Sequence, residues 1–138
     1  MDRSTVDRRG WAGFPNAAIL KRTFAVIARV WSAQTGADHL QIYVEHFSSH
    51  VLPALKNCDG YVSATVLTRQ LNNETEIVVT TFWKSMEAIE AFAGTDRDRA
   101  VVAAEAAALL TTFDNRVLHY TVAVTDGCEA ISRLRGPG

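Results

Sequence analysis

The sequence predicts an α+β fold in which an antiparallel sheet carries its helices on one face. Four segments rich in β-branched and aromatic residues, at 24–31, 61–70, 74–83 and 115–124, are typical of strands. Helical spacing of apolar side chains follows the first and the third of these segments. The resulting order, β-α-β-β-α-β, is that of the ferredoxin-like fold and predicts a four-stranded antiparallel sheet.

The strands are marked in different ways. FAVIARVW, at 24–31, is apolar apart from one arginine and is typical of a buried strand. The segments 61–70 and 74–83 flank a Leu-Asn-Asn sequence that suits a tight turn, so they predict an antiparallel hairpin. NRVLHYTVAV, at 115–124, predicts the last strand.

Three helices are expected between and after these strands. The segment 35–57 places its apolar residues on one stripe, and Pro53 predicts a bend or break near its end. Ser85 can cap a shorter helix that stops at Gly94. A Thr-x-x-Asp pattern, similar to a capping box, precedes a third helix expected at 99–113.

The chain divides into three parts. Residues 1–22 hold five basic and two acidic side chains without a continuous apolar stretch, which predicts a flexible arm. Residues 23–124 form the predicted ferredoxin-like domain. Residues 125–138 show no clear period and end in Gly and Pro, so a fraying tail is expected there.

Composition narrows the classes of function. A net charge of −1 does not suit a nucleic-acid-binding protein, which needs a surplus of Lys and Arg. No apolar run reaches the roughly 20 residues of a membrane span, so no membrane association is expected. Cys58 and Cys128 lie far apart without a metal-binding pattern, which favours free thiols and a cytoplasmic location.

The sheet is expected to have a second apolar face. Ile, Val and aromatic residues alternate along the strands, so both faces carry apolar side chains. The predicted helices cover one face only, and a large exposed apolar face needs a cover. A second copy of the chain is the simplest cover, which predicts a homodimer joined through the sheet face.

Three motifs resemble the antibiotic biosynthesis monooxygenase family of dimeric α+β barrels: IARVW, FWKSMEAIEAFAG and FDNRVLHYTVA. The resemblance covers roughly residues 25–124. It implies a cofactor-independent oxygenase of the kind that acts on phenols and quinols, and it implies that Trp83 lines a substrate pocket. The family also has a haem-degrading branch and many members of unknown activity, so the fold alone does not give the function.

The residues present argue against bound haem or metal. The haem-degrading branch has an asparagine and a histidine where this chain has Ala28 and, within a residue or two, Val102. Neither side chain can ligate iron or donate a hydrogen bond. His39, His46 and His50 share one predicted helix, but no second carboxylate–histidine cluster completes a metal site. No nucleotide or flavin motif occurs either, so no cofactor is expected.

Four residues are candidates for the chemistry of such a pocket. His119, in the middle of a strand, has a pKa range that suits a general base, although a histidine satisfied by its neighbours is the alternative. His50 could reach the mouth of the pocket as a second base. Trp83 and Tyr43 offer an N–H and a hydroxyl as donors to a developing oxyanion. Trp83 could instead pack the corner between strand and helix.

Arg29 is the fifth candidate. A charge within a central strand needs a partner, and the neighbouring hairpin offers Glu76 for a structural ion pair at the dimer interface. If the arginine faces the pocket instead, it could bind a carboxylate or enolate of the substrate. Two functions are therefore expected: a cofactor-independent monooxygenase-like enzyme acting on a small aromatic, phenolic or quinol-like compound, or a stress-associated barrel that binds a small metabolite without transforming it.

Overall fold

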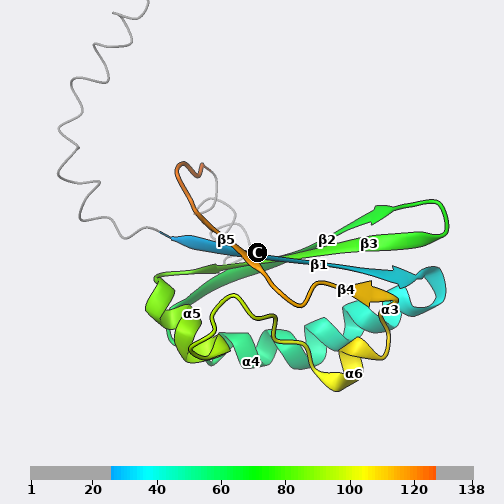
Figure 1. The fold of residues 1–138 in the computed structure, drawn as a ribbon, viewed down its shortest axis with the longest axis horizontal. Coiled ribbons are helices and arrows are strands. Elements are labelled where there is room, and N and C mark those ends of the chain that lie inside the picture. The colour runs from blue at the N-terminus through cyan, green and yellow to red at the C-terminus, as the bar shows by residue number, and fades with distance from the viewer. Residues whose placement is uncertain (1–25, 127–138) are drawn as a thin grey trace, which may run out of the picture.

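The computed structural model describes residues 26–126 as one antiparallel sheet with its helices on one face (Figure 1). The predicted α+β class with a ferredoxin-like order of elements is confirmed. The predicted arm at 1–22, Cys128, and the predicted tail beyond residue 126 lie outside the described residues.

The sheet is centred on two long strands. β1 (Ile27–Gly36) and β3 (Glu74–Trp83) pair in antiparallel register over their whole length. β2 (Tyr61–Gln70) flanks β3 and forms the predicted hairpin with it. The backbone N–H of Leu71 closes the turn by donating to the carbonyl of Glu74 at 2.7 Å.

Two short strands complete the other side of β1. β4 (Thr112–Phe113) pairs near the end of β1, and β5 (Leu118–Thr121) pairs near its beginning. The described sheet therefore has five strands where four were predicted, and the last strand is shorter than the predicted 115–124. The chain approaches β1 twice because the residues between β4 and β5 leave the sheet.

The first helical region is continuous but changes its winding. α3 (Ala37–His46) runs into a π-helical turn, η1 (Phe47–Val51), and then into α4 (Leu52–Lys56). The N–H of Leu52 donates to the carbonyl of Phe47, five residues back. Pro53 follows directly and has no N–H to continue the α-helical ladder, so the irregularity predicted for this proline is confirmed. No helix within residues 26–126 is long and apolar enough to cross a lipid bilayer.

The second helix has the predicted ends. Ser85 caps α5 (Met86–Ala93), and its hydroxyl accepts from the N–H of Ala88 at 3.1 Å. Gly94 ends the helix with φ of +96°, a conformation that costs glycine little. Both signals depend on local backbone chemistry, which is why the sequence showed them.

The third helix was predicted wrongly. Of the segment 99–113, only α6 (Ala104–Ala107) is helical. The carbonyl oxygens of Arg97 and Arg99 accept hydrogen bonds from the guanidinium of Arg29, at 2.6 and 2.8 Å. In a helix, backbone N–H groups four residues later would occupy these carbonyls. The segment before α6 is therefore held open by a strand residue about 70 positions earlier in the chain.

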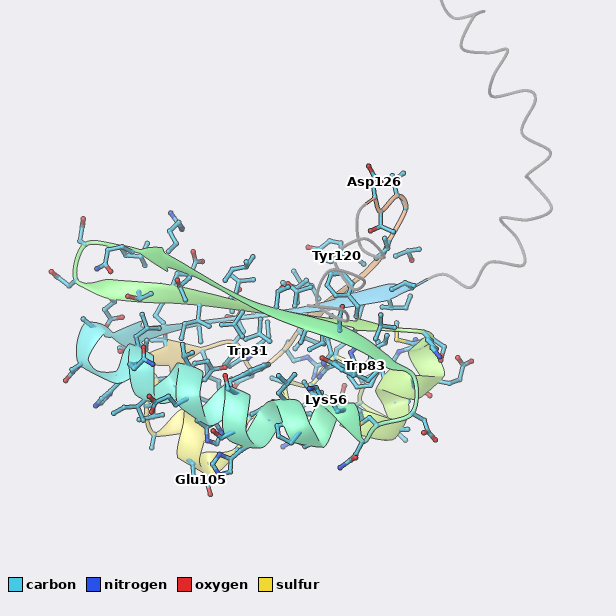
Figure 2. The ribbon with its side chains drawn as sticks, turned by 180° about the vertical axis from the view of Figure 1, so that it is seen from behind. Trp31, Lys56, Trp83, Glu105, Tyr120 and Asp126 are labelled. Carbon is cyan, nitrogen blue, oxygen red and sulfur yellow. The ribbon has the colours of Figure 1, made fainter. Side chains whose placement is uncertain are left out.

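The two faces of the sheet differ in what they contact. The odd-numbered residues of β1 and β3 point toward the helices, and the even-numbered ones point away. Figure 2 shows Trp31 and Trp83 between the sheet and the helices, with Tyr120 on the opposite face. The core lies between the sheet and the helices, where four large side chains are fully buried: Trp83, Leu55, Ile77 and Ile89.

The face away from the helices carries exposed apolar side chains. Leu67, Leu118 and Tyr120 are 56%, 60% and 54% exposed. Every labelled helix in Figure 1 lies on the other face. This distribution agrees with the reasoning behind the predicted homodimer, which itself stays a prediction.

Candidate functional site

A cavity of about 90 Å³, named here the sheet–helix cavity, lies between the sheet and the helices. Strands β1 and β3 form one wall, and α3, η1 and α4 form the other. The segment before α6 closes one side. Most of the lining side chains are apolar, among them Phe47, Val51, Leu55, Val79, Val102 and Ala106.

The cavity reaches the surface beside the segment that precedes α6. Val101 and Ala103 line the cavity and are themselves exposed, so they mark its mouth. Pockets for drug-sized ligands have about 300–1,000 Å³, whereas an apolar cavity of about 150 Å³ can take up benzene. At about 90 Å³ the sheet–helix cavity is smaller than either, so a single small ring would fill it and extend into its mouth.

Arg29 brings a positive charge to this apolar space. The residue lines the cavity and is only 5% exposed. Besides its bonds to two carbonyl oxygens, its Nη1 lies 3.0 Å from Nε2 of His119. The guanidinium also lies over the ring of Phe92, with 5.7 Å from Cζ to the ring centroid. Burial lowers the pKa of Arg29, and the charge of Asp98 opposes that effect.

The predicted partner of Arg29, Glu76, is on the wrong face of the sheet. Residues directly opposite one another in paired strands share a face, and Arg29 opposes Thr81 whereas Glu76 opposes Gln34. Glu76 instead forms an ion pair with Arg69 at 2.8 Å on the face away from the helices. The predicted Arg29–Glu76 pair is therefore wrong.

His119 lies behind Arg29 and does not line the cavity. Its Nδ1 lies 3.1 Å from a carboxylate oxygen of Asp98. A guanidinium can only donate, so Nε2 of His119 accepts a hydrogen bond from Arg29. Nδ1 therefore carries the ring proton and donates it in a hydrogen bond to Asp98. Burial first, and the Arg29 charge second, lower the pKa of His119 against the opposing effect of Asp98. The imidazole of His119 is thus neutral, and the lone pair on its Nε2 already accepts the hydrogen bond from Arg29.

Tyr43 presents the second polar group of the cavity. The residue is 4% exposed and lines the cavity from α3. Burial raises the pKa of Tyr43 to about 12, so the hydroxyl keeps its proton at neutral pH. Among the described residues the hydroxyl has no hydrogen-bond partner. It is therefore available as a donor to a ligand.

Trp83 is buried beneath the cavity and is not among its lining residues. The side chain is fully buried, and its ring packs against those of Tyr61 and Phe92 at 5.8 and 5.1 Å between centroids. Its N–H donates to the hydroxyl of Thr81 at 2.9 Å. The geometry matches the alternative of a tryptophan that packs the corner, while its predicted role in substrate binding stays a prediction.

Two lining residues that carry polar groups, Trp31 and Thr81, were not among the predicted site residues. Trp31 lines the cavity two positions after Arg29, and its N–H donates to the carbonyl of Asp114 at 2.8 Å. Thr81 lines it from the opposing position on β3. Alternate residues of a strand share a face, and so do directly opposed residues of paired strands. Once Arg29 is known to face the helices, Trp31 and Thr81 are therefore expected on the same face.

The helix histidines lie apart from the cavity. His50 is exposed, does not line the cavity, and stacks on His46 with 5.1 Å between ring centroids. Nε2 of His46 is buried without a hydrogen-bond partner among the described residues. Within residues 26–126, no group of three or more His, Cys, Asp or Glu side chains could hold a metal ion.

The lining thus supplies donors to an oxygen atom and a flat apolar wall. Arg29, Tyr43 and the hydroxyl of Thr81 can donate, and no histidine or carboxylate is among the described lining residues. Such an arrangement can bind a small ring and stabilise negative charge on one of its oxygens. A general base is not part of it.

Comparisons with known proteins agree on one family and one fold. The family model described as antibiotic biosynthesis monooxygenase matches residues 23–104. A solved Bacillus cereus protein, assigned as an antibiotic biosynthesis monooxygenase, superposes with a TM-score of 0.53 at 18% identity, over 74% of this chain and 97% of that one. A conserved Methanosarcina mazei protein gives 0.53 at 15% identity, over 74% and 97%.

A third solved structure extends the same result. A protein from Chloroflexus aurantiacus, also assigned as an antibiotic biosynthesis monooxygenase, gives a TM-score of 0.52 at 13% identity, over 75% of this chain and 98% of that one. At such identities the three structures support the fold alone. No curated protein matches the chain by sequence.

Proposed function

The chain belongs to the antibiotic biosynthesis monooxygenase family, and we propose that its sheet–helix cavity binds a small aromatic, phenolic or quinol-like compound and supports its cofactor-independent oxygenation. One observation carries the proposal: a small apolar cavity that opens at the surface presents two donors for an oxygen atom, Arg29 and Tyr43. The catalytic roles expected of His119 and His50, and the substrate contact expected of Trp83, stay predictions within this proposal.

Cofactor-independent oxygenation requires few functional groups from the protein. A phenol and O₂ give a quinone and water, so the substrate supplies all the electrons and no redox cofactor enters the balance. One oxygen atom joins the ring and the other leaves as water. The protein contributes a dry apolar space and donors that stabilise the phenolate and the developing oxyanion. The apolar walls and the hydroxyl of Tyr43 suit these tasks.

Binding without oxygenation is the second candidate, and one observation favours it. No described side chain that lines the cavity is a histidine or a carboxylate, so no general base touches the bound ring. A site with donors and no base suits retention of a metabolite. The two candidates share the cavity and differ only in turnover.

The experiment measures ligand binding and oxygen uptake on the same samples. Phenol and hydroquinone serve as probes, with binding followed by calorimetry and uptake by an oxygen electrode. Ala106→Leu fills the cavity, because Ala106 lines it and is 5% exposed. Ala108→Leu is the matched control, since Ala108 caps the same helix, is exposed and does not line the cavity.

We expect both probes to bind to the unchanged protein, and Ala106→Leu to weaken binding by more than about tenfold. Ala108→Leu should bind as the unchanged protein does. Oxygen uptake that disappears with Ala106→Leu supports the oxygenase, and binding without uptake supports the second candidate. Equal binding by both variants would exclude the sheet–helix cavity as the site.

The homodimer is also part of the proposal. The face away from the helices exposes Leu67, Leu118 and Tyr120, and a second copy of the chain would cover them. Leu118→Asp places a charge on that face and should shift the chain to monomer in sedimentation equilibrium. The exposed residue Glu105, on the helix side, gives a control in Glu105→Lys. A monomeric unchanged protein would contradict the homodimer.

A further inference from the structure

Arg29 is a buried cation without a carboxylate partner in the described part of the chain. Three arginines and His119 lie within ion-pair distance of a carboxylate, but none of these ion pairs among residues 26–126 includes Arg29. Its contacts are two carbonyl oxygens, the neutral ring of His119 and the face of Phe92. These groups offer dipoles and a quadrupole, and none of them carries a full negative charge.

Such a charge is costly unless an anion faces it. A buried ion loses its hydration, and partners with partial charges restore only part of that free energy. The carboxylate that acts on Arg29 is that of Asp98, which is exposed and separated from it by the ring of His119. The geometry therefore leaves the positive charge of Arg29 only partly compensated.

The guanidinium also keeps unused donors. An arginine has five N–H groups, and three are used in the bonds to Arg97, Arg99 and His119. Two donors thus have no partner among the described residues. Since Arg29 lines the sheet–helix cavity, a ligand there can reach this charge.

We propose that the sheet–helix cavity selects an organic anion, a single-ring aromatic with one carboxylate or phenolate oxygen group, and that Arg29 is the residue that recognises the anionic group. The proposal rests on the proposed function, because it names the class of ligand for the same cavity. The ring contacts apolar wall residues such as Val79 and Phe47, and the oxygen atoms lie against Arg29. A neutral analogue leaves the charge unpaired, and a cationic analogue adds a second positive charge to it.

His119 is a positioning residue for Arg29 in this arrangement. Nε2 of His119 and the carbonyl oxygen of Arg97 both accept hydrogen bonds from Nη1, so the plane of the guanidinium is fixed before any ligand enters. Asp98 fixes the tautomer by accepting from Nδ1. A donor held in place in this way binds an oxygen anion without first losing side-chain freedom.

The test compares three probes of one size near neutral pH: benzoate, benzyl alcohol and benzylamine. They share the ring and differ in charge. We expect benzoate to bind about tenfold or more tightly than benzyl alcohol, since an anion gains charge-assisted hydrogen bonds to Arg29. Benzylamine should bind more weakly than either.

Two substitutions that each remove one positive charge distinguish an effect of Arg29 in the cavity from an effect of surface charge. Arg29→Gln should remove the preference for benzoate over benzyl alcohol. Arg69→Gln is the matched control, because Arg69 is 70% exposed, lies on the other face of the sheet and pairs with Glu76. It removes the same charge from the chain and should leave the preference unchanged.

A second measurement needs no substitution at Arg29 and covers the case in which Arg29→Gln does not fold. The Nε–H resonance of Arg29 and the ring resonances of His119 are followed by NMR in the unchanged protein. Benzoate should shift both sets, and benzyl alcohol should shift neither to the same extent. His119→Ala removes the acceptor for Nη1 of Arg29 and should weaken benzoate binding more than benzyl alcohol binding, whereas a purely structural role would affect both equally.

The outcomes are distinct. Equal binding of benzoate and benzyl alcohol, both lost in Ala106→Leu, would overturn the anion preference and leave the proposed cavity in place. Binding of neither probe would overturn both proposals. Benzoate binding that Arg69→Gln reduces as much as Arg29→Gln would assign it to general surface charge and overturn the role of Arg29.

Discussion

Arg29 and His119 are directly opposed residues of β1 and β5, with 3.0 Å between Nη1 and Nε2. A guanidinium has no acceptor, so the contact requires an unprotonated Nε2. Protonation of His119 would replace this hydrogen bond with two cations in contact. The pair therefore links the protonation of a single histidine to the position of the charge in the cavity.

We expect stability to fall with acidification because of His119. Burial and the neighbouring Arg29 lower the pKa of His119 in the folded chain. The unfolded chain then binds this proton more readily than the folded one, so the free energy of unfolding rises with pH in that window. The contribution is complete above the unfolded pKa of about 6.5, and it is lost as the pH falls through the folded pKa.

Urea denaturation from neutral pH to mildly acidic pH measures this effect. His119→Gln retains an oxygen that can accept from Arg29 and has no proton to gain, so its stability should depend less on pH than that of the unchanged protein. His39→Gln is the control, because it removes another histidine from a different element, α3. If the His119→Gln and unchanged proteins lose stability in parallel, His119 is not the group responsible.

Trp83 should matter for stability more than Trp31 does. Trp83 is fully buried, packs on two rings and donates to Thr81. Trp83→Phe removes part of this volume and leaves the Thr81 hydroxyl without its donor, at a cost of about 1–3 kcal/mol in the free energy of unfolding. Trp31 is only half-buried, so Trp31→Phe should cost less.

Binding should show the opposite order. Trp31 lines the sheet–helix cavity and Trp83 does not, so Trp31→Phe should change phenol affinity more than Trp83→Phe. Chemical denaturation followed by circular dichroism, and calorimetry with phenol, give the two readouts. A loss of phenol binding in the folded Trp83→Phe variant that exceeds the loss in Trp31→Phe would instead support the predicted role of Trp83 in substrate binding.

The parts of the fold that depend on neighbouring residues could be predicted from the sequence. The hairpin of β2 and β3 has its observed bounds because strand alternation and turn chemistry act within a few residues. The Ser85 cap is local in the same way. The conformation of the segment before α6 could not be predicted, because its carbonyl oxygens accept hydrogen bonds from Arg29, which lies on a strand far away in the sequence.

The candidate site shows the same division. Residue type pointed to Arg29 and Tyr43, and both line the cavity. The partner of Arg29 could not be predicted, since it depends on the register of β1 against both β3 and β5. The sequence placed Arg29 in a central strand and left open which of several charged residues would share its face. Only the paired strands show that His119 does and that Glu76 does not.

Gly60 and Gly94 allow a matched test of how closely α5 packs against the start of the hairpin. Both have positive φ, +88° and +96°, so an alanine at either position is strained by about 1–3 kcal/mol. A Cβ on Gly60 would clash with Cβ of Ala88 on α5, whereas a Cβ on Gly94 meets nothing within 4 Å among the described residues. The two substitutions thus share the strain and differ in the clash.

We expect Gly60→Ala to lower the free energy of unfolding more than Gly94→Ala does. Ala88→Gly removes the atom that the new Cβ would meet, so the double variant Gly60→Ala/Ala88→Gly should recover part of the difference, although glycine within a helix costs about 1 kcal/mol itself. Urea denaturation of the unchanged protein, Gly60→Ala, Ala88→Gly and the double variant completes a double-mutant cycle and measures the coupling. A coupling near zero would mean that α5 moves away from Gly60 freely, and that its packing does not depend on this glycine.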